Sequence, residues 1–260
     1  MTWLALRLLR PYLIVAATLA AAATAYLVHA AGVVRRQLDA AGLPDCVDPN
    51  YCYPQGAALD AVLGMELTAA FVPPLIALIL GVALFARERE SGTTAFVLTQ
   101  SVSRRRWVLT KLGWALAAAV TCTGTVALVF RLVATRYTAI ASDTYELLQL
   151  LHLNNAAYMV AQSALLVALA GIIGLSVGRT LQTLILTAVS GPVALALAAG
   201  IWAMLATGIA AVTGPIDTAA AEGFASERTY FDPFAYPVSV VVVLGVLGLV
   251  LLAPKVGAET

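Results

Sequence analysis

The chain has 260 residues, of which 61% are hydrophobic and 11% are charged, and its mean hydropathy is +0.91. Soluble domains carry about 25% charged residues, so this chain has too little polar surface to remain a soluble globule. The formal net charge is +1, and the two lysines lie in no basic run, which argues against a nucleic-acid-binding protein. The composition predicts an integral membrane protein.

Six runs of the sequence lack Asp, Glu, Lys and Arg, and each is 19 to 37 residues long. About 20 apolar residues in a helix cross a hydrocarbon core of about 30 Å, so each run can hold one transmembrane helix. The sequence therefore predicts an all-α integral membrane protein, a single domain over residues 1–260, with helices near 12–31, 66–86, 110–133, 156–178, 183–211 and 237–254. In the fifth helix, Ser190, Gly191 and Pro192 could either kink one helix or divide two short ones.

The basic residues are distributed unequally between the two sides that six helices define. Ten of the 15 Lys and Arg residues lie in the segments that include both termini, and five lie in the opposite segments. The positive-inside rule assigns the richer set to the cytoplasm. We therefore expect a multi-pass protein of the plasma membrane with both termini cytoplasmic. The N-terminal segment 2–11 places Trp3, Arg7 and Arg10 on one stripe, which suits an interfacial helix, although a simple positively charged flank fits equally.

Two cysteines, Cys46 and Cys52, lie in the first outer loop of this topology. An oxidising face and a short, proline-rich turn favour a disulfide between them, and the alternative is two free thiols. Metal binding is not expected, since neither histidine has the spacing to complete a site.

The sequence lacks the motifs of an enzyme. A phosphate-binding loop needs a lysine directly after glycine, whereas Lys111 follows Thr110 and Lys255 follows Pro254. The predicted spans also contain almost no ionisable group that could perform catalysis or couple transport to an ion. The exceptions lie at the outer ends of helices and are interpreted as interfacial residues: Glu66, Arg131 and His29. We expect no catalytic residue, bound cofactor or metal in this chain, and any driving force to come from another subunit.

The most distinctive segment lies between the second and third predicted helices, at residues 87–107. Charged residues 87–90 carry the chain out of the bilayer, and Gly92 allows a turn. A short amphipathic segment follows around Phe96, Ser103 can cap the next helix, and arginines 104–106 with Trp107 suit anchoring at the headgroups. These features suit either a loop that fixes topology or a docking element for a soluble partner.

Three pieces of this loop carry a resemblance to a known family. They are Arg-Glu-Arg-Glu-Ser-Gly-Thr at 87–93, Leu-Thr-Gln-Ser-Val-Ser-Arg-Arg-Arg-Trp at 98–107, and Lys-Leu at 111–112. Their wording and spacing resemble the loop of ABC-2 type transporter permeases, most closely those of high-GC Gram-positive bacteria. The resemblance covers this loop in motif and the whole chain in its six-helix layout.

The resemblance implies an exporter in which two permease chains pair in the membrane and bind two separate ATPase subunits, which hold Mg-ATP. It implies that the loop forms a coupling helix on the ATPase, with its glutamates pairing with basic groups of the ATPase or of the N-terminal helix. The ATPase-coupling candidates are Glu88, Glu90, Gly92, Thr93, Phe96, Thr99, Gln100, Ser103 and Arg104. A homodimer surrounded by membrane lipids is expected.

The resemblance also implies a substrate path between the two permease copies, lined by the second and fifth helices. Helix-weakening positions could act as hinges there, and two side chains could face the cavity. The candidates are Met65, Phe71, Pro73, Pro74, Ser190, Gly191 and Pro192. Residues 214–237 fit short re-entrant helices of an outer gate, and an ordinary aromatic interface belt is the alternative.

The leading hypothesis is the permease subunit of an ATP-driven ABC exporter for an amphipathic or hydrophobic compound, such as a drug, lipid, peptide or natural product. The near absence of charge in the spans argues against a strongly ionic cargo. Two alternatives stay open: a membrane sensor or immunity subunit with the same architecture and no net transport, and an unpowered channel or scaffold.

Overall fold

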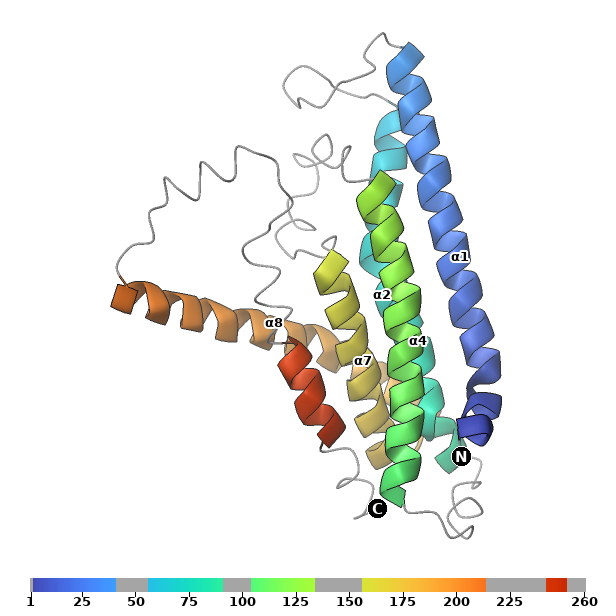
Figure 1. Cartoon of the computed structure of the whole chain (residues 1–260), viewed down its shortest axis with the longest axis vertical. Coiled ribbons are helices and arrows are strands. Elements are labelled where there is room, and N and C mark those ends of the chain that lie inside the picture. The colour runs from blue at the N-terminus through green and yellow to red at the C-terminus, as the bar shows by residue number, and fades with distance from the viewer. Residues whose placement is uncertain (1, 41–55, 91–103, 134–155, 214–241, 252–260) are drawn as a thin grey trace.

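The computed structural model describes residues 2–40, 56–90, 104–133, 156–213 and 242–251, with only the backbone given for residues 2–5, 104, 199, 200 and 202–213. The described part is helical, and five of its helices are long and apolar enough to cross a membrane (Figure 1). They are α1 (Thr2–Ala40), α2 (Ala57–Glu90), α4 (Arg104–Val133), α7 (Ala156–Val177) and α8 (Thr180–Thr213). A multi-pass membrane protein follows from these five helices.

The first two helices are longer than a bilayer requires. α1 has 39 residues and α2 has 34, which correspond to about 58 and 51 Å at about 1.5 Å per residue. Both therefore extend beyond a hydrocarbon core of about 30 Å. In α2 the extension includes charged residues 87–90, which continue the helix because Arg and Glu are good helix formers.

Several expected elements differ from the structure or lie outside its described part. Residues 2–11 belong to the single helix α1, with Pro11 inside it, so a separate interfacial helix is not confirmed. Of the expected sixth span at 237–254, the structure describes a ten-residue apolar helix, Val242–Leu251, and the rest lies outside the described residues, so a sixth span is not confirmed. Of the expected coupling segment, residues 87–90 belong to α2 and residues 104–107 to α4, and residues 91–103 lie outside the described residues.

Helix α2 occupies the centre of the arrangement. It contacts α1, α4, α7 and α8, whereas α1 packs mainly on α2 and α4. Four helices, α1, α2, α4 and α7, run along one common direction, and α8 crosses them steeply (Figure 1). The apolar core between them includes Leu80, Leu84 and Phe85 of α2, Leu112 of α4 and Val167 of α7, all buried.

Helices α2 and α7 approach each other closely at Gly81. A Cβ atom at this position would lie 2.6 Å from the Ala170 Cβ and 3.2 Å from the Val167 Cα. Small residues let transmembrane helices approach closely enough for their backbones to touch. Gly81 therefore fixes the distance and the register between the central helix and its main neighbour.

We predict that Gly81→Ala destabilises the bundle by about 1–3 kcal/mol, because the new methyl group overpacks the α2–α7 contact. Gly113→Ala is the matched control, since no atom lies within 4 Å of the Cβ that it would add and alanine is favoured over glycine in a helix. The thermal unfolding midpoint in detergent measures both. Equal midpoints for Gly81→Ala and the wild type would contradict the packing role.

Candidate functional site

The last turn of α2 is the most polar part of the described bundle. Arg87, Glu88, Arg89 and Glu90 are consecutive, and we call these four residues the charged end of α2. Successive residues on an α-helix point about 100° apart, so the four side chains radiate in four directions. Each of them contacts a different neighbouring helix.

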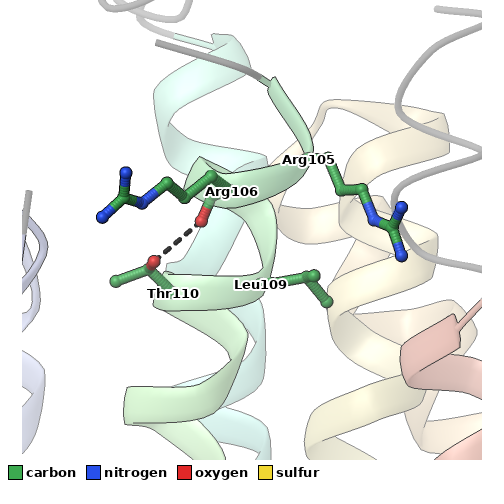
Figure 2. A pocket seen from close by; sticks show the side chains of 4 residues that line it. All are labelled: Arg105, Arg106, Leu109 and Thr110. Carbon is green, nitrogen blue, oxygen red and sulfur yellow. Dashed lines mark hydrogen bonds between the residues drawn. The ribbon is translucent and has the colours of Figure 1, made fainter.

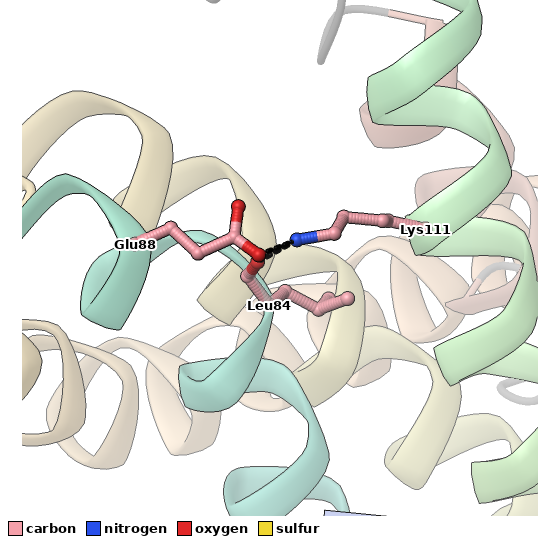
Figure 3. A network of polar contacts seen from close by, with 3 residues as sticks. All are labelled: Leu84, Glu88 and Lys111. Atoms are coloured by element: carbon pink, nitrogen blue, oxygen red, sulfur yellow. Dashed lines mark hydrogen bonds and ion pairs between the residues drawn. The ribbon is translucent and has the colours of Figure 1, made fainter. Parts of the chain in front are cut away.

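Glu88 reaches α4, where it forms an ion pair with Lys111 (Figure 3). Lys111 is only 1% exposed, and its ammonium group also donates a hydrogen bond to the Leu84 carbonyl oxygen at 3.3 Å. The ammonium nitrogen lies 4.7 Å from the centre of the Trp107 ring and 5.8 Å from that of Phe85. A carboxylate, a carbonyl and two aromatic faces thus compensate for the loss of hydration of this buried cation.

Arg89 reaches the end of α7. Its guanidinium donates hydrogen bonds to the carbonyl oxygens of Leu175 and Ser176. The last carbonyls of a helix have no partner within that helix and carry a partial negative charge, which a cation stabilises. Gly178 follows with a φ of +69°, and a Cβ atom there would lie 3.0 Å from the Arg89 Nε. Glycine therefore provides both the left-handed turn that ends α7 and the space for Arg89.

Glu90 reaches the beginning of α8. One of its carboxylate oxygens accepts hydrogen bonds from the Thr180 backbone N–H, at 3.3 Å, and from the Thr180 hydroxyl. Thr180 is the first residue of α8, whose first N–H groups lack acceptors within the helix. A carboxylate at this position acts as an N-terminal cap supplied by another helix.

Arg87 reaches α1. Its guanidinium donates a hydrogen bond to the Tyr12 hydroxyl, and the guanidinium carbon lies 5.8 Å from the centre of the Tyr12 ring. The charged end of α2 is thereby connected to α1, α4, α7 and α8 within a single helical turn. Any displacement of this turn acts on all four helices.

The predicted coupling residues are only partly described by the structure. Glu88 and Glu90 belong to the charged end of α2, and Arg104 begins α4. The other candidates lie outside the described residues: Gly92, Thr93, Phe96, Thr99, Gln100 and Ser103. The two glutamates bind Lys111 and Thr180 within the chain, whereas the sequence interpretation assigned them to the ATPase or the N-terminal helix. The residue of the charged end that contacts α1 is Arg87.

Sequence reasoning missed five of the residues that build this site: Tyr12, Arg87, Arg89, Lys111 and Thr180. Lys111 lies two turns inside α4 in the structure, whereas the sequence predicted that this helix begins near residue 110. The predicted start placed Lys111 at the end of the span, where an ionisable group does not require a partner. The four charged residues 87–90 were interpreted as the point where the chain leaves the bilayer. Their alternating positive and negative charges were therefore not interpreted as contacts with four different helices.

The start of α4 forms an open pocket lined by Arg105, Arg106, Leu109 and Thr110. Figure 2 shows the two arginine side chains on opposite sides of the helix, while the Thr110 hydroxyl donates to the Arg106 carbonyl oxygen at 2.7 Å. Both arginines are exposed, as expected for headgroup anchoring. Trp107, which was expected to share that role, is instead buried and lies 5.4 Å from Phe85 between ring centres.

The residues proposed to line a substrate path or to act as hinges lie in different environments. Phe71 is 63% exposed on the outside of the bundle, whereas Met65 is fully buried within it. Pro73 and Pro74 lie inside α2 and Pro192 lies inside α8, so none of these prolines ends its helix. Gly191 is buried, and a Cβ atom there would lie 2.4 Å from Leu166 of α7, so Gly191 and its half-buried neighbour Ser190 lie at a packing contact. Cys46 and Cys52 lie outside the described residues.

Glu66 differs from its interpretation as an interfacial residue. It lies in the body of α2, is 1% exposed, and neither of its carboxylate oxygens has a hydrogen-bond partner among the described residues. Its neighbours along the helix, Val62, Ala69 and Ala70, are also buried. Burial of a carboxyl group without partners opposes folding.

We predict that Lys111→Met destabilises the protein by about 3–5 kcal/mol, because it leaves the Glu88 carboxylate without its ammonium partner. The double variant Lys111→Met/Glu88→Met should recover much of this loss, since both charges are then absent. Arg106→Met is the control for removal of an exposed basic residue from the same helix. Thermal unfolding, followed by tryptophan fluorescence, is compared for the wild type, the two single variants and the double variant. Purely additive effects of the two substitutions would contradict the pairing.

We also predict that Glu66→Met stabilises the protein by about 1–3 kcal/mol, because it removes a buried polar group that has no partner. Asp60→Met, at an exposed acidic residue of the same helix, should bring no such gain. The thermal unfolding midpoint measures both variants. A lower midpoint for Glu66→Met would show that the carboxyl group makes a stabilising interaction.

Comparison with known proteins gives a match to one family model, described as ABC-2 membrane transporter related. The match covers residues 16–204, which is more than half of the chain and includes α2, α4, α7 and the charged end of α2. No curated protein and no solved structure matches the chain. The matched length is sufficient to assign the family, and the chain belongs to the ABC-2 membrane transporter related family.

Proposed function

We propose that this chain is the transmembrane permease subunit of an ATP-driven exporter, and that it moves an amphipathic or hydrophobic compound across the plasma membrane. Family membership supports a permease that associates with an ABC ATPase. The sequence contains no phosphate-binding loop, so ATP hydrolysis is assigned to that partner. Two permease copies and two ATPase subunits form the proposed complex, with both permease termini in the cytoplasm.

The observation that carries the proposal is the position of the charged end of α2. The chain passes from Glu90 directly into residues 91–103, which are the middle part of the expected coupling segment 87–107. The four preceding side chains contact α1, α4, α7 and α8. A force that an ATPase applies to this segment therefore reaches every long helix of the described bundle through one helical turn.

The exporter assignment also has support from the apolar character of the bundle. Several large aliphatic side chains of α8 are exposed, including Leu181, Val189, Val193 and Leu197, and Phe71 of α2 is exposed as well. Surfaces of this kind suit lipid or an amphipathic cargo better than a strongly ionic one. Drug, lipid, peptide and natural-product cargoes all share this chemistry.

We predict that the double variant Phe96→Ala/Gln100→Ala reduces binding of the ATPase at least tenfold, because it removes an apolar contact and a hydrogen-bonding group from the coupling segment. Tyr51→Ala/Gln55→Ala is the matched control, since it removes an aromatic residue and a glutamine from the predicted outer loop. The tagged permease is purified from native membranes, and the co-purifying ABC ATPase is quantified. Equal recovery with both double variants would contradict coupling through this segment.

A second measurement separates an exporter from a membrane sensor. The wild-type complex is reconstituted in proteoliposomes loaded with a fluorescent amphipathic dye, and dye movement is followed with and without ATP. Movement that requires ATP supports export. ATP hydrolysis that depends on the permease but moves no dye or native lipid extract favours the sensor, and an absence of any bound ATPase favours the unpowered channel or scaffold.

A further inference from the structure

The connection between α7 and α8 is held from both sides by α2. Only Gly178 and Arg179 separate the two helices. The Gly178 N–H donates to the Gly174 carbonyl oxygen at 3.1 Å, and the Arg179 carbonyl oxygen accepts from the Thr183 N–H at 3.0 Å. The turn is therefore hydrogen-bonded to both helices, which restricts the movement of one helix relative to the other at this point. At this turn the chain changes from the direction of α7 to that of α8, which lies across the other long helices (Figure 1).

The two residues of α2 that touch this turn have opposite charges, and each matches the helix end that it meets. Arg89 donates to carbonyl oxygens at the C-terminal end of α7, which carries a partial negative charge. Glu90 accepts from Thr180 at the N-terminal end of α8, which carries a partial positive charge. Consecutive residues of one helix thus cap the end of one neighbour and the beginning of the next.

The contacts of the charged end differ in how easily they can open. The Glu88–Lys111 pair is largely buried, and separating it would leave a buried ammonium group without its carboxylate. Glu90 is exposed, and water can replace the hydrogen bonds that it makes to Thr180. The contact with α4 is therefore a permanent anchor, while the contact with α8 can open at low cost.

We infer that Arg89 and Glu90 form a double cap on the α7–α8 turn, that the contact made by Glu90 is releasable, and that Thr180 is the positioning residue through which movement of the coupling segment changes the direction of α8. This inference rests on the proposed function, because the movement is supplied by the ATPase. Glu90 acts in this scheme through α8 and needs no contact with the ATPase. The buried Glu88–Lys111 pair serves as the fixed point about which the last residue of α2 moves.

The cap itself is tested on the purified full-length permease in lipid nanodiscs, without any ATPase. We expect Glu90→Ala and Thr180→Ala to increase the hydrogen–deuterium exchange rate of the first turn of α8 about tenfold, because the first residue of α8 then loses its contact with the carboxylate that caps the helix. Thr180→Ser retains the hydroxyl and should exchange like the wild type. Thr187→Ala is the control on the same helix, since its hydroxyl bonds to Thr183 within α8.

The direction of α8 is measured in the same samples as a distance between two spin labels. The labels replace Leu128 on α4 and Leu197 on α8, which are both exposed, in a background with the native cysteines changed to serine. We expect a shifted or broadened distance distribution for Glu90→Ala and Thr180→Ala, and an unchanged one for Thr180→Ser and Thr187→Ala. Identical exchange and identical distances in all variants would overturn the inference.

A final arm adds the ATPase and a non-hydrolysable ATP analogue. We expect nucleotide to shift the α4–α8 distance in the wild type and to have a much smaller effect in Glu90→Ala, although both bind the ATPase. If the ATPase binds and the wild-type distance does not respond, the inference is overturned and the proposed function stands. If no ATPase binds, the proposed function fails, and with it the part of the inference in which the ATPase moves α8.

Discussion

A lysine inside an apolar helix bundle is the constraint on which the rest of this structure depends. Lys111 has almost no access to solvent, so its charge must be balanced by groups that other parts of the chain supply. Glu88, the Leu84 carbonyl and the rings of Trp107 and Phe85 do so. Because three of these four groups lie on α2, the requirement fixes α2 beside α4 in one register. It also explains why α2 remains helical beyond its apolar segment.

Once α2 is fixed in this way, its neighbouring charged residues acquire defined partners. Arg87 and Glu90 lie on either side of the buried pair and point to α1 and α8. A helix that ends in this manner differs from one whose charged residues simply enter solvent. The charged end of α2 connects the membrane-spanning bundle to the segment that follows Glu90. This connection combines one buried contact, the Glu88–Lys111 pair, with contacts that are more exposed.

The sequence predicted helix positions better than helix contacts. The third and fourth predicted helices, 110–133 and 156–178, have C-terminal ends within one residue of those of α4 and α7, because an uninterrupted apolar run is a strong signal for a span. The start of α4 lies six residues before the predicted one. The length of α2 was underestimated, because charged residues interrupt an apolar run in the sequence without ending the helix. Membership in an ABC-2 family also followed from the loop motifs and agrees with the family match.

The orientation of side chains could not be predicted for the same reason that the spans were easy to find. Helices α2, α7 and α8 are apolar on all faces, so periodicity does not show which face is buried. Met65 and Phe71 were both assigned to a cavity, yet one is buried and the other exposed. Glu66 was placed at a membrane interface by its position in the sequence, whereas its burial depends on how other helices pack against α2. Likewise, no local pattern links Glu90 to Thr180 across 90 residues.

The placement of four charges on four successive residues has a consequence for how α2 can change in length. Gly81 fixes the rotation of this helix against α7, and six residues later Arg87 begins the charged turn. Adding or deleting a single residue between them would rotate the turn by about 100°, and three of the four charged side chains would then face the partner of a neighbour. Arginine would meet lysine, and glutamate would meet the carbonyl end of α7. This short stretch of α2 therefore accepts substitutions of similar size but no change in length.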